Sequence, residues 1–216
     1  MLNNFYTIQS VAEYLKKEIS GYYISEVFSQ EKNKFLIEVK KNSTDEEFKI
    51  LEFSIEKESN FLVEKKYFSK AKKNYADIFP EVYRKKILEA EIFNNDRVIC
   101  FTLEDDYEII FTFFTNKSNC FIVNNSAIEN SFKDRDEYQG KNINEVLSGK
   151  SHASGKELKT GSVKEILKIN YRKLGNVYLK EVIFKSDFKE NDQVNEDNFK
   201  ILKKEIDEIV QDRVEE

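Results

Sequence analysis

The chain has 216 residues, of which 40% are hydrophobic and 35% are charged, and its formal net charge is -5 at pH 7. This length allows one large domain or two modest ones, and the composition is that of a globular rather than a disordered protein. The negative net charge excludes a uniformly basic nucleic-acid coat, although a global sum can hide local differences in sign.

The start of the chain and its cysteines predict a cytoplasmic protein. The first ten residues have neither the basic nor the apolar region of a signal peptide. No stretch approaches the roughly 18 apolar residues that a membrane span needs. Cys100 and Cys120 both lie in apolar strand patterns and are expected to be buried thiols, not a disulfide framework. We therefore expect a cytoplasmic protein with no membrane partner.

The first part of the chain predicts one helix followed by a block of strands. Apolar residues at helical spacing indicate a helix over residues 7–19, and Gly21 is placed to end it. Segments with alternating or continuous apolar residues follow, separated by polar breaks. The predicted strands are residues 22–29, 34–41, 48–55 and 60–66.

A short helix is expected next, near residues 76–87, where Asp77 can cap it and Pro80 falls in the first turn. A second block of strands with short turns occupies residues 88–123. Its predicted strands are residues 88–94, 97–103, 107–114 and 119–124.

The strand at residues 98–103 is apolar on both faces. Val98 and Cys100 point one way, whereas Ile99, Phe101 and Leu103 point the other. A strand of this kind suits a sheet packed between two layers. We therefore predict an α+β fold whose first domain, residues 1–132, is a β-sandwich-like two-sheet domain with flanking helices.

The rest of the chain predicts a linker and a helical domain. Residues 133–161 hold four of the six glycines and the only histidine, His152, and read as a linker with one short helix at 142–147. Residues 162–216 form the predicted helical domain, which could lead into a coiled coil. Its helices are expected at residues 162–170, 175–186 and 196–213, the first two forming a helical hairpin.

Motifs for catalysis or cofactor binding are not found in the sequence. One histidine and two separated cysteines cannot build a metal cluster, and there is neither a Gly-rich phosphate loop nor a G-x-S-x-G nucleophile elbow. A Ser-His or Cys-His unit would need His152, which lies in the predicted linker. We expect a protein that is not an enzyme and needs no cofactor or metal.

Two features remain as candidate sites. Asp96 and Arg97 stand together at the start of a buried strand, where a rigid scaffold would hold them within reach of solvent. Charge is also unevenly distributed: residues 65–86 contain eight bases and two acids, a net +6, whereas residues 187–216 contain five bases and eleven acids, a net -6. A structural alternative is that Asp96 caps the turn and pairs with Arg97.

Three segments resemble the NFACT family of ribosome quality-control factors (RqcH-like proteins, also called fibronectin-binding protein A). FYTIQSVAEYLKKEISGYYISEVFSQEKNKFLIEVK at 5–40 is similar to the family's first helix and hairpin. NNDRVICFTLEDDYEIIFTFFTNKSNCFIVN at 94–124 is similar to its Asp-Arg strand pair and basic-Ser-Asn turn, and LGNVYLKEVIF at 174–184 to its helix-hairpin-helix.

This resemblance implies a tRNA- and large-ribosomal-subunit-binding module. Such proteins bind large subunits obstructed by peptidyl-tRNA and support mRNA-independent, C-terminal alanine tailing of stalled chains. The family's coiled coil and C-terminal RNA-binding domain have no counterpart here, and we expect a monomer in isolation. The implied tRNA-binding residues are Asp96, Arg97, Lys117 and Asn119. Basic residues of the 65–86 stretch would add phosphate contacts: Lys65, Lys66, Lys70, Lys72, Lys73, Arg84 and Lys85.

Two other functions stay open. The family's fibronectin-binding name suggests an adhesin or protein-interaction module, although the chain shows no export signal. The fold is also similar to the N-terminal fold of formamidopyrimidine-DNA glycosylases, which suggests a non-catalytic DNA-binding relative. Those enzymes use a Pro-Glu pair directly after the initiator Met, where this chain has Leu2 and Asn3.

Overall fold

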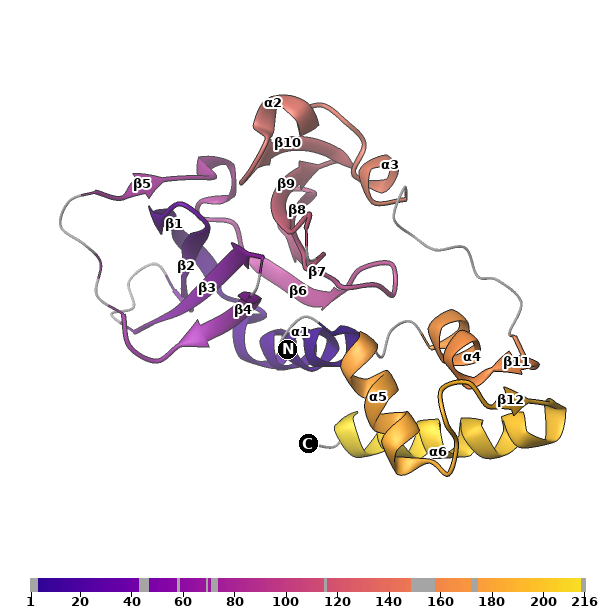
Figure 1. The fold of residues 1–216 in the computed structure, drawn as a ribbon. Helices are drawn as coiled ribbons and strands as arrows, with labels where there is room; N and C mark the ends of the chain where they lie inside the picture. Colours follow the sequence, from indigo (N-terminus) through magenta and orange to yellow (C-terminus); the bar gives the residue numbers. More distant parts are fainter. Residues whose placement is uncertain are drawn as a thin grey trace. The chain divides into compact units, whose positions relative to one another are not determined.

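The computed structural model describes residues 4–42, 47–57, 59–68, 70, 74–114, 116–148, 158–171 and 175–214, with the backbone alone described for residues 175–178 and 209–214. The chain forms two compact units, one containing residues 7–151 and the other residues 4–6 and 152–216 (Figure 1).

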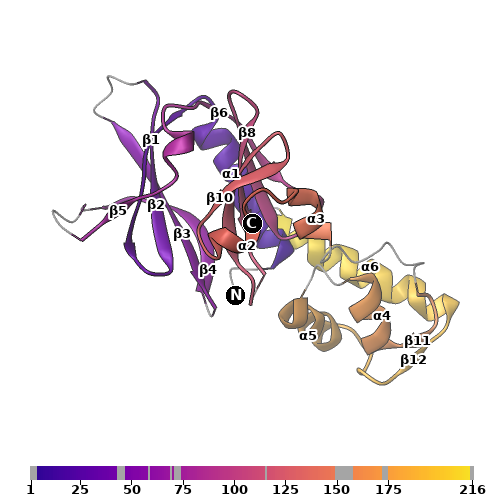
Figure 2. The same ribbon diagram turned by 90° about the horizontal axis from the view of Figure 1, so that it is seen from above.

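The first unit contains two five-stranded antiparallel sheets, seen as separate groups of strands in Figures 1 and 2. The first sheet has the order β4-β3-β2-β1-β5 and the second has the order β10-β9-β8-β7-β6. Helix α1 spans Phe5–Ile19. The strands of the first sheet are β1 (Tyr23–Glu31), β2 (Lys34–Lys40), β3 (Phe48–Glu56), β4 (Ser59–Lys65) and β5 (Ala76–Asp77). The strands of the second are β6 (Ile87–Ile92), β7 (Val98–Leu103), β8 (Tyr107–Thr112), β9 (Asn119–Asn124) and β10 (Ala127–Ser131).

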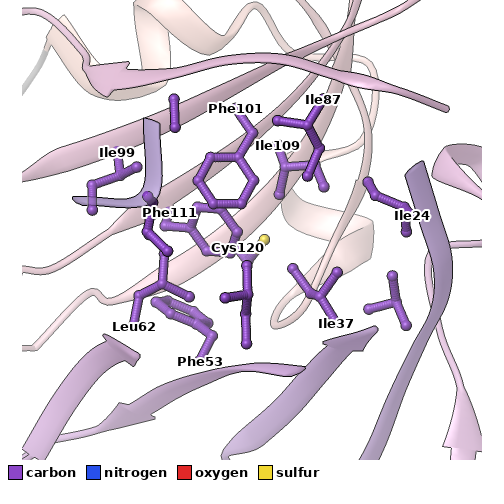
Figure 3. Close-up of a cluster of buried hydrophobic side chains, with 14 of the residues drawn as sticks. Ile24, Ile37, Phe53, Leu62, Ile87, Ile99, Phe101, Ile109, Phe111 and Cys120 are labelled. Atoms are coloured by element: carbon purple, nitrogen blue, oxygen red, sulfur yellow. The ribbon is translucent and has the colours of Figure 1, made fainter. Parts of the chain in front are cut away.

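The main core of the first unit lies between the two sheets and against α1. Both sheets contribute large apolar side chains to it, among them Phe53 of the first sheet and Phe111 of the second, whose ring centroids are 5.1 Å apart (Figure 3). The alternation predicted for β7 is confirmed. Ile99 and Phe101 belong to this core, whereas Cys100 faces a second cluster on the other side of the sheet.

The second cluster includes residues that lie past residue 132, where the first domain was predicted to end. Residues 133–148 were expected to be linker with one short helix at 142–147. They contain α3 (Ile143–Ser148), where that helix was predicted, and α2 (Arg135–Tyr138), which was not predicted. Ile143 and Leu147 of α3 are buried against the outer face of the second sheet. Polar composition suggested a linker, but a few well-spaced apolar residues are enough to pack a short helix onto an apolar sheet face.

Two further predictions for the first unit were wrong. The helix expected at 76–87 is reduced to β5 and one 3-10 turn, η1 (Pro80–Val82), because left-handed backbone at Phe79 (φ 55°) and Arg84 (φ 65°) interrupts any helix there. Strand β10 was missed, since its sequence AIENS lacks apolar alternation. It is added to the sheet by the turn at Asn125 and Ser126, both with positive φ.

The second unit has three helices, as predicted: α4 (Val163–Asn170), α5 (Gly175–Lys185) and α6 (Glu196–Val214). A capping box begins α4, where the hydroxyl of Ser162 and the carboxylate of Glu165 each accept a backbone N–H of the other residue. Two short strands missed by the sequence, β11 (Gly161–Ser162) and β12 (Gln193–Val194), pair beside it. Residues from all three helices and from β12 share one apolar core: Val163, Ile166, Leu167, Leu179, Val182, Val194, Phe199, Leu202 and Ile206.

No helix within the described residues is both long and apolar enough to cross a membrane.

Candidate functional site

The turn between β6 and β7 places Asp96 and Arg97 at one end of the second sheet. Asn94 and Asn95 adopt left-handed backbone, with φ of 51° and 52°, which asparagine tolerates better than most residues. The backbone N–H of Asp96 donates to the carbonyl of Phe93 at 3.2 Å. Both Asp96 and Arg97 are half-buried. The pair is thus fixed at the strand entrance, as predicted.

The carboxylate of Asp96 binds the backbone of Arg97, not its side chain. Its Oδ1 accepts the Arg97 N–H at 2.7 Å. Within the described part of the chain, the guanidinium of Arg97 forms no ion pair with a carboxylate. Of the structural alternative, the turn contact of Asp96 is present, whereas an ion pair between the Asp96 and Arg97 side chains is not among the contacts of the described residues. Asp96 shapes the turn from which Arg97 extends.

An aromatic ring holds the guanidinium of Arg97 instead. Its Cζ lies 5.5 Å from the ring centroid of Phe114, and the Arg97 carbonyl accepts the backbone N–H of Phe113 at 3.0 Å. A cation–π contact uses the flat face of a guanidinium and leaves the N–H donors along its edge available to a ligand. The sequence did not single out Phe114, although two phenylalanines directly before a turn were a usable signal.

Lys117 lies in the turn that also carries Phe114. Its backbone N–H donates to the Phe114 carbonyl at 2.7 Å, and its side chain is exposed. The hydroxyl of Ser118 donates to the same carbonyl at 3.0 Å and accepts from buried Asn60 of β4 at 2.6 Å, which anchors the turn to the first sheet. Lys117 is therefore placed beside Phe114. We call Asp96, Arg97, Phe114 and Lys117 the Arg97 site.

Asn119 is the fourth residue expected to contact tRNA. Its side-chain amide is hydrogen-bonded within the protein. It is buried, its Oδ1 accepts the backbone N–H groups of Cys120 and Lys133 at 2.9 Å each, and its Nδ2 donates to the Lys133 carbonyl at 3.0 Å. With both ends of the amide engaged, Asn119 joins β9 to the segment after β10. It is a structural residue.

Most described lysines of the expected phosphate-binding stretch are paired with acids. Lys65 pairs with Glu52 at 2.5 Å, Lys70 with Glu26 at 2.6 Å and Lys85 with Asp105 at 2.8 Å. Lys70 and Lys85 also lie over aromatic rings, Lys70 at 4.5 Å from Phe28 and 4.4 Å from Tyr75, and Lys85 at 4.2 Å from Tyr107. Lys66 and Arg84 are exposed, and Lys72 and Lys73 lie outside the described residues.

These three pairings offset half of the stretch's apparent excess of six positive charges. The acids that neutralise it come from other strands and turns, so they are invisible in a local count of charges. Lys65, Lys70 and Lys85 each have an acid partner in the fold, and the phosphate contacts of the stretch stay a prediction.

Burial raises the pKa of several other ionisable groups in the first unit. Burial raises the pKa of the Cys100 and Cys120 thiols well above the usual range, which keeps them protonated and unreactive. Desolvation likewise raises the pKa of Glu108 on β8, although a hydrogen bond from Cys100 opposes the rise.

Among the described residues, no group of three or more His, Cys, Asp or Glu side chains could hold a metal ion.

No protein-family model and no curated protein matches the sequence. Solved structures do share the fold. A crystal structure of the fibrinogen binding protein from Staphylococcus aureus matches with a TM-score of 0.67 at 14% identity, covering 99% of this chain and 83% of that one. The N-terminal domain of fibronectin-binding protein PavA from Streptococcus pneumoniae matches with 0.56 at 13% identity, covering 96% and 81%.

The N-terminal part of the fibronectin/fibrinogen-binding protein from Streptococcus suis matches with a TM-score of 0.58 at 12% identity, covering 94% of this chain and 84% of that one. The chain is therefore similar in fold to the N-terminal regions of fibronectin-binding proteins over nearly its whole length. Identities this low establish the shared fold alone.

Proposed function

We propose that this chain is an RNA-binding module that binds tRNA and the large ribosomal subunit and belongs functionally with the quality-control factors that support alanine tailing of stalled chains. The observation that carries the proposal is the Arg97 side chain. It is half-buried at the end of a rigid sheet, its guanidinium rests on Phe114, and no described carboxylate neutralises it.

The chemistry of this site favours RNA as the ligand. A guanidinium offers a planar fork of donors that matches phosphate oxygens or the edge of a guanine base. Exposed Lys117 adds a second positive charge in the neighbouring turn. The aromatic ring of Phe114 also belongs to the kind of surface on which unstacked RNA bases are recognised. The fold shared with fibronectin-binding proteins is consistent with the NFACT resemblance, which supplies tRNA as the specific RNA.

The direct test is equilibrium binding of labelled tRNA to wild type and to Arg97→Ala at fixed salt. We expect the substitution to weaken binding by about tenfold or more, because a bidentate arginine contact is worth about 1–3 kcal/mol. Arg97→Lys keeps the charge but not the fork, so it should recover only part of the loss.

Lys141→Ala is the matched control. Lys141 is an exposed cation at the opposite end of the second sheet, and its Nζ lies 5.7 Å from the ring centroid of Tyr138. This variant removes one charge and one cation–π contact from a different place, so tRNA binding should stay within about twofold of wild type, since loss of a distant charge changes only the long-range field. Equal losses in the two variants would contradict a site at Arg97.

A second candidate function comes from the structural neighbours, whose names say that they bind fibronectin or fibrinogen. Under this alternative the chain would bind fibronectin, and its affinity would not depend on Arg97 in the way that phosphate or base recognition requires. Binding of purified fibronectin to the folded chain, unaffected by Arg97→Ala, would favour it.

A further inference from the structure

One lysine of the first unit is held by two aromatic rings and a carboxylate. The Nζ of Lys70 lies 4.5 Å from the ring centroid of Phe28 and 4.4 Å from that of Tyr75. The same nitrogen donates to the carboxylate of Glu26 at 2.6 Å. Ring faces together with an anion are the components of a cage that binds an ammonium group. We call Glu26, Phe28 and Tyr75 the ammonium cage.

The ammonium cage is built on two paired strands of the first sheet. Glu26 and Phe28 lie two residues apart on β1, so their side chains leave the strand on the same face. Val27 between them belongs to the core between the two sheets, which places the cage on the outer face of the first sheet. Tyr75 directly precedes β5, which pairs with β1 (Figure 1).

The rings of the cage also contact each other and the sheet. The centroids of Phe28 and Tyr75 are 6.3 Å apart, with the ring planes at 76°. Phe28 is buried with apolar residues of β2 and β3, and the ring of Phe68 lies 5.5 Å from it. Because these contacts do not involve Lys70, we expect the cage to keep its shape when the Lys70 side chain leaves.

The cage is open to solvent on one side. Tyr75 is 42% exposed, and the side chains of Lys70 and Glu26 are 30% and 41% exposed. One ring is therefore fixed against the sheet while the other borders the solvent. A cation that arrives from outside can reach the same ring faces and the same carboxylate that Lys70 now contacts.

The contact with two rings distinguishes Lys70 from the other described cations. Lys85, for example, lies over the single ring of Tyr107 at 4.2 Å and pairs with Asp105 at 2.8 Å. Among the described residues, only Lys70 has a cation–π contact with two rings. Lys85 combines one ring with one acid, so it is a natural control for the cage.

We propose that the ammonium cage is a binding site for a lysine side chain of a partner protein, and that Lys70 occupies it as a competitor from the same chain. The negative charge of Glu26 and the two ring faces select an ammonium group over a neutral or anionic one. The dimensions suit lysine, since a lysine ammonium fills the cage in the structure. The cage binds a cation and shares no residue with the Arg97 site, so the inference does not rest on RNA binding.

The test is an NMR titration of the isotope-labelled 216-residue chain with three small probes. They are N-acetyl-lysine methylamide, its Nε-trimethyl form and the uncharged N-acetyl-norleucine methylamide. Both cationic probes should shift the backbone signals of Phe28 and Tyr75, whereas the norleucine probe should not. Lys70→Ala should bind the cationic probes about fivefold or more tightly than wild type, because a tethered occupant lowers the apparent affinity by the fraction of time that the site is vacant.

Variants of Tyr75 test whether a ring face is needed. Tyr75→Leu should weaken binding of the cationic probes by about threefold or more, whereas Tyr75→Phe keeps the ring and should bind as wild type does. Lys85→Ala is the matched control and should leave the affinity unchanged, since the charge that it removes lies over a different ring. Thermal unfolding identifies any variant that has lost its fold. The two Tyr75 variants, made in the wild-type background, decide the question if Lys70→Ala does not fold.

The outcomes are distinct. Tighter binding of the cationic probes by Lys70→Ala, lost again when Tyr75→Leu is added, supports the inference, and the more tightly bound of the two probes identifies the partner group as plain or methylated lysine. Equal binding of the norleucine probe, or a folded Lys70→Ala that binds no more tightly than wild type, overturns it. An equal gain in Lys85→Ala also overturns it, because binding would then follow net charge. None of these outcomes depends on whether Arg97→Ala binds RNA.

Discussion

At the scale of single residues, Arg97 differs from Lys65, Lys70 and Lys85 in what holds its charged group. Lys65, Lys70 and Lys85 each lie within 2.8 Å of a carboxylate. The guanidinium of Arg97 is held by the face of Phe114, a contact worth about 0.5–1 kcal/mol at an exposed site. Such a weak contact can orient the side chain without consuming its hydrogen-bond donors, which is the property that a recognition residue needs.

Asp96 is expected to act through the turn and not through its charge. Asp96→Asn keeps an oxygen that can accept the Arg97 N–H, so both stability and tRNA affinity should stay near wild type. Asp96→Ala removes that acceptor and should lower the free energy of unfolding by about 1 kcal/mol. Urea denaturation and tRNA titration of both variants check this. A large loss of affinity in a fully stable Asp96→Asn would show that the carboxylate charge itself contacts the ligand.

Asn119 offers a prediction about stability. Asn119→Ala leaves the buried backbone N–H groups of Cys120 and Lys133 without their acceptor and should lower the free energy of unfolding by about 2–3 kcal/mol. Exposed Asn144→Ala is the control and should change little. The measurement is urea unfolding followed by far-UV circular dichroism. An Asn119→Ala protein as stable as wild type but defective in tRNA binding would restore Asn119 as a contact residue.

Glu108 predicts a dependence of stability on pH. Its pKa is raised in the folded protein, mainly because burial disfavours the carboxylate, so the unfolded chain releases this proton at a lower pH than the folded one. Glu108 therefore lowers stability progressively as pH rises through the ordinary carboxyl range. Glu108→Gln should be more stable than wild type at pH 7, and the difference should vanish in acid.

The control for this pH dependence is Glu145→Gln, at an exposed position on α3. Unfolding free energies measured from about pH 3 to pH 7 compare the three proteins, a range that brackets the ordinary carboxyl pKa. A Glu108→Gln advantage that grew toward low pH would contradict the sign of the shift.

At the scale of elements, the sequence predicted the long strands and helices and the short helix at 142–147, and it failed for the other short elements. The first four strands and β6–β9 follow apolar alternation or continuous apolar runs, which a local pattern reveals. Strand β10 and helix α2 have few apolar residues, and each lies against a sheet that is already present. Such elements depend on tertiary contacts, so no local pattern could have placed them.

Helix α3 supplies a test of that tertiary dependence. Ile143 is 1% exposed and packs in the cluster that contains Val98 and Cys100. Ile143→Ala should lower the free energy of unfolding by about 2–5 kcal/mol and speed the reaction of Cys100 with a thiol reagent, because the helix that covers this cluster is weakened. Exposed Glu145→Ala should do neither. An unaffected Ile143→Ala protein would mean that residues 133–148 are the linker first expected.

At the scale of the whole molecule, the net charge of a surface depends on residues that folding brings together from distant parts of the sequence. The net charge of +6 in residues 65–86 suggested a phosphate-binding surface, yet Glu26, Glu52 and Asp105 reach it from other strands and turns. The Asp-Arg pair was visible in the sequence, but its aromatic partner was not, because Phe114 lies on the far side of a hairpin. The sequence thus placed Asp96 and Arg97 together at a strand entrance, but it did not show that the Asn119 amide is engaged inside the protein, because the partners of Asn119 depend on strand pairing.

One competition measurement tests the central claim most directly. Labelled tRNA and labelled fibronectin are titrated in parallel with wild type, Arg97→Ala and Lys141→Ala under the same salt conditions. Our account predicts that wild type and Lys141→Ala bind tRNA, that Arg97→Ala binds it at least about tenfold more weakly, and that excess fibronectin does not displace the tRNA. Tight fibronectin binding without tRNA binding, or tRNA binding indifferent to Arg97, would contradict it.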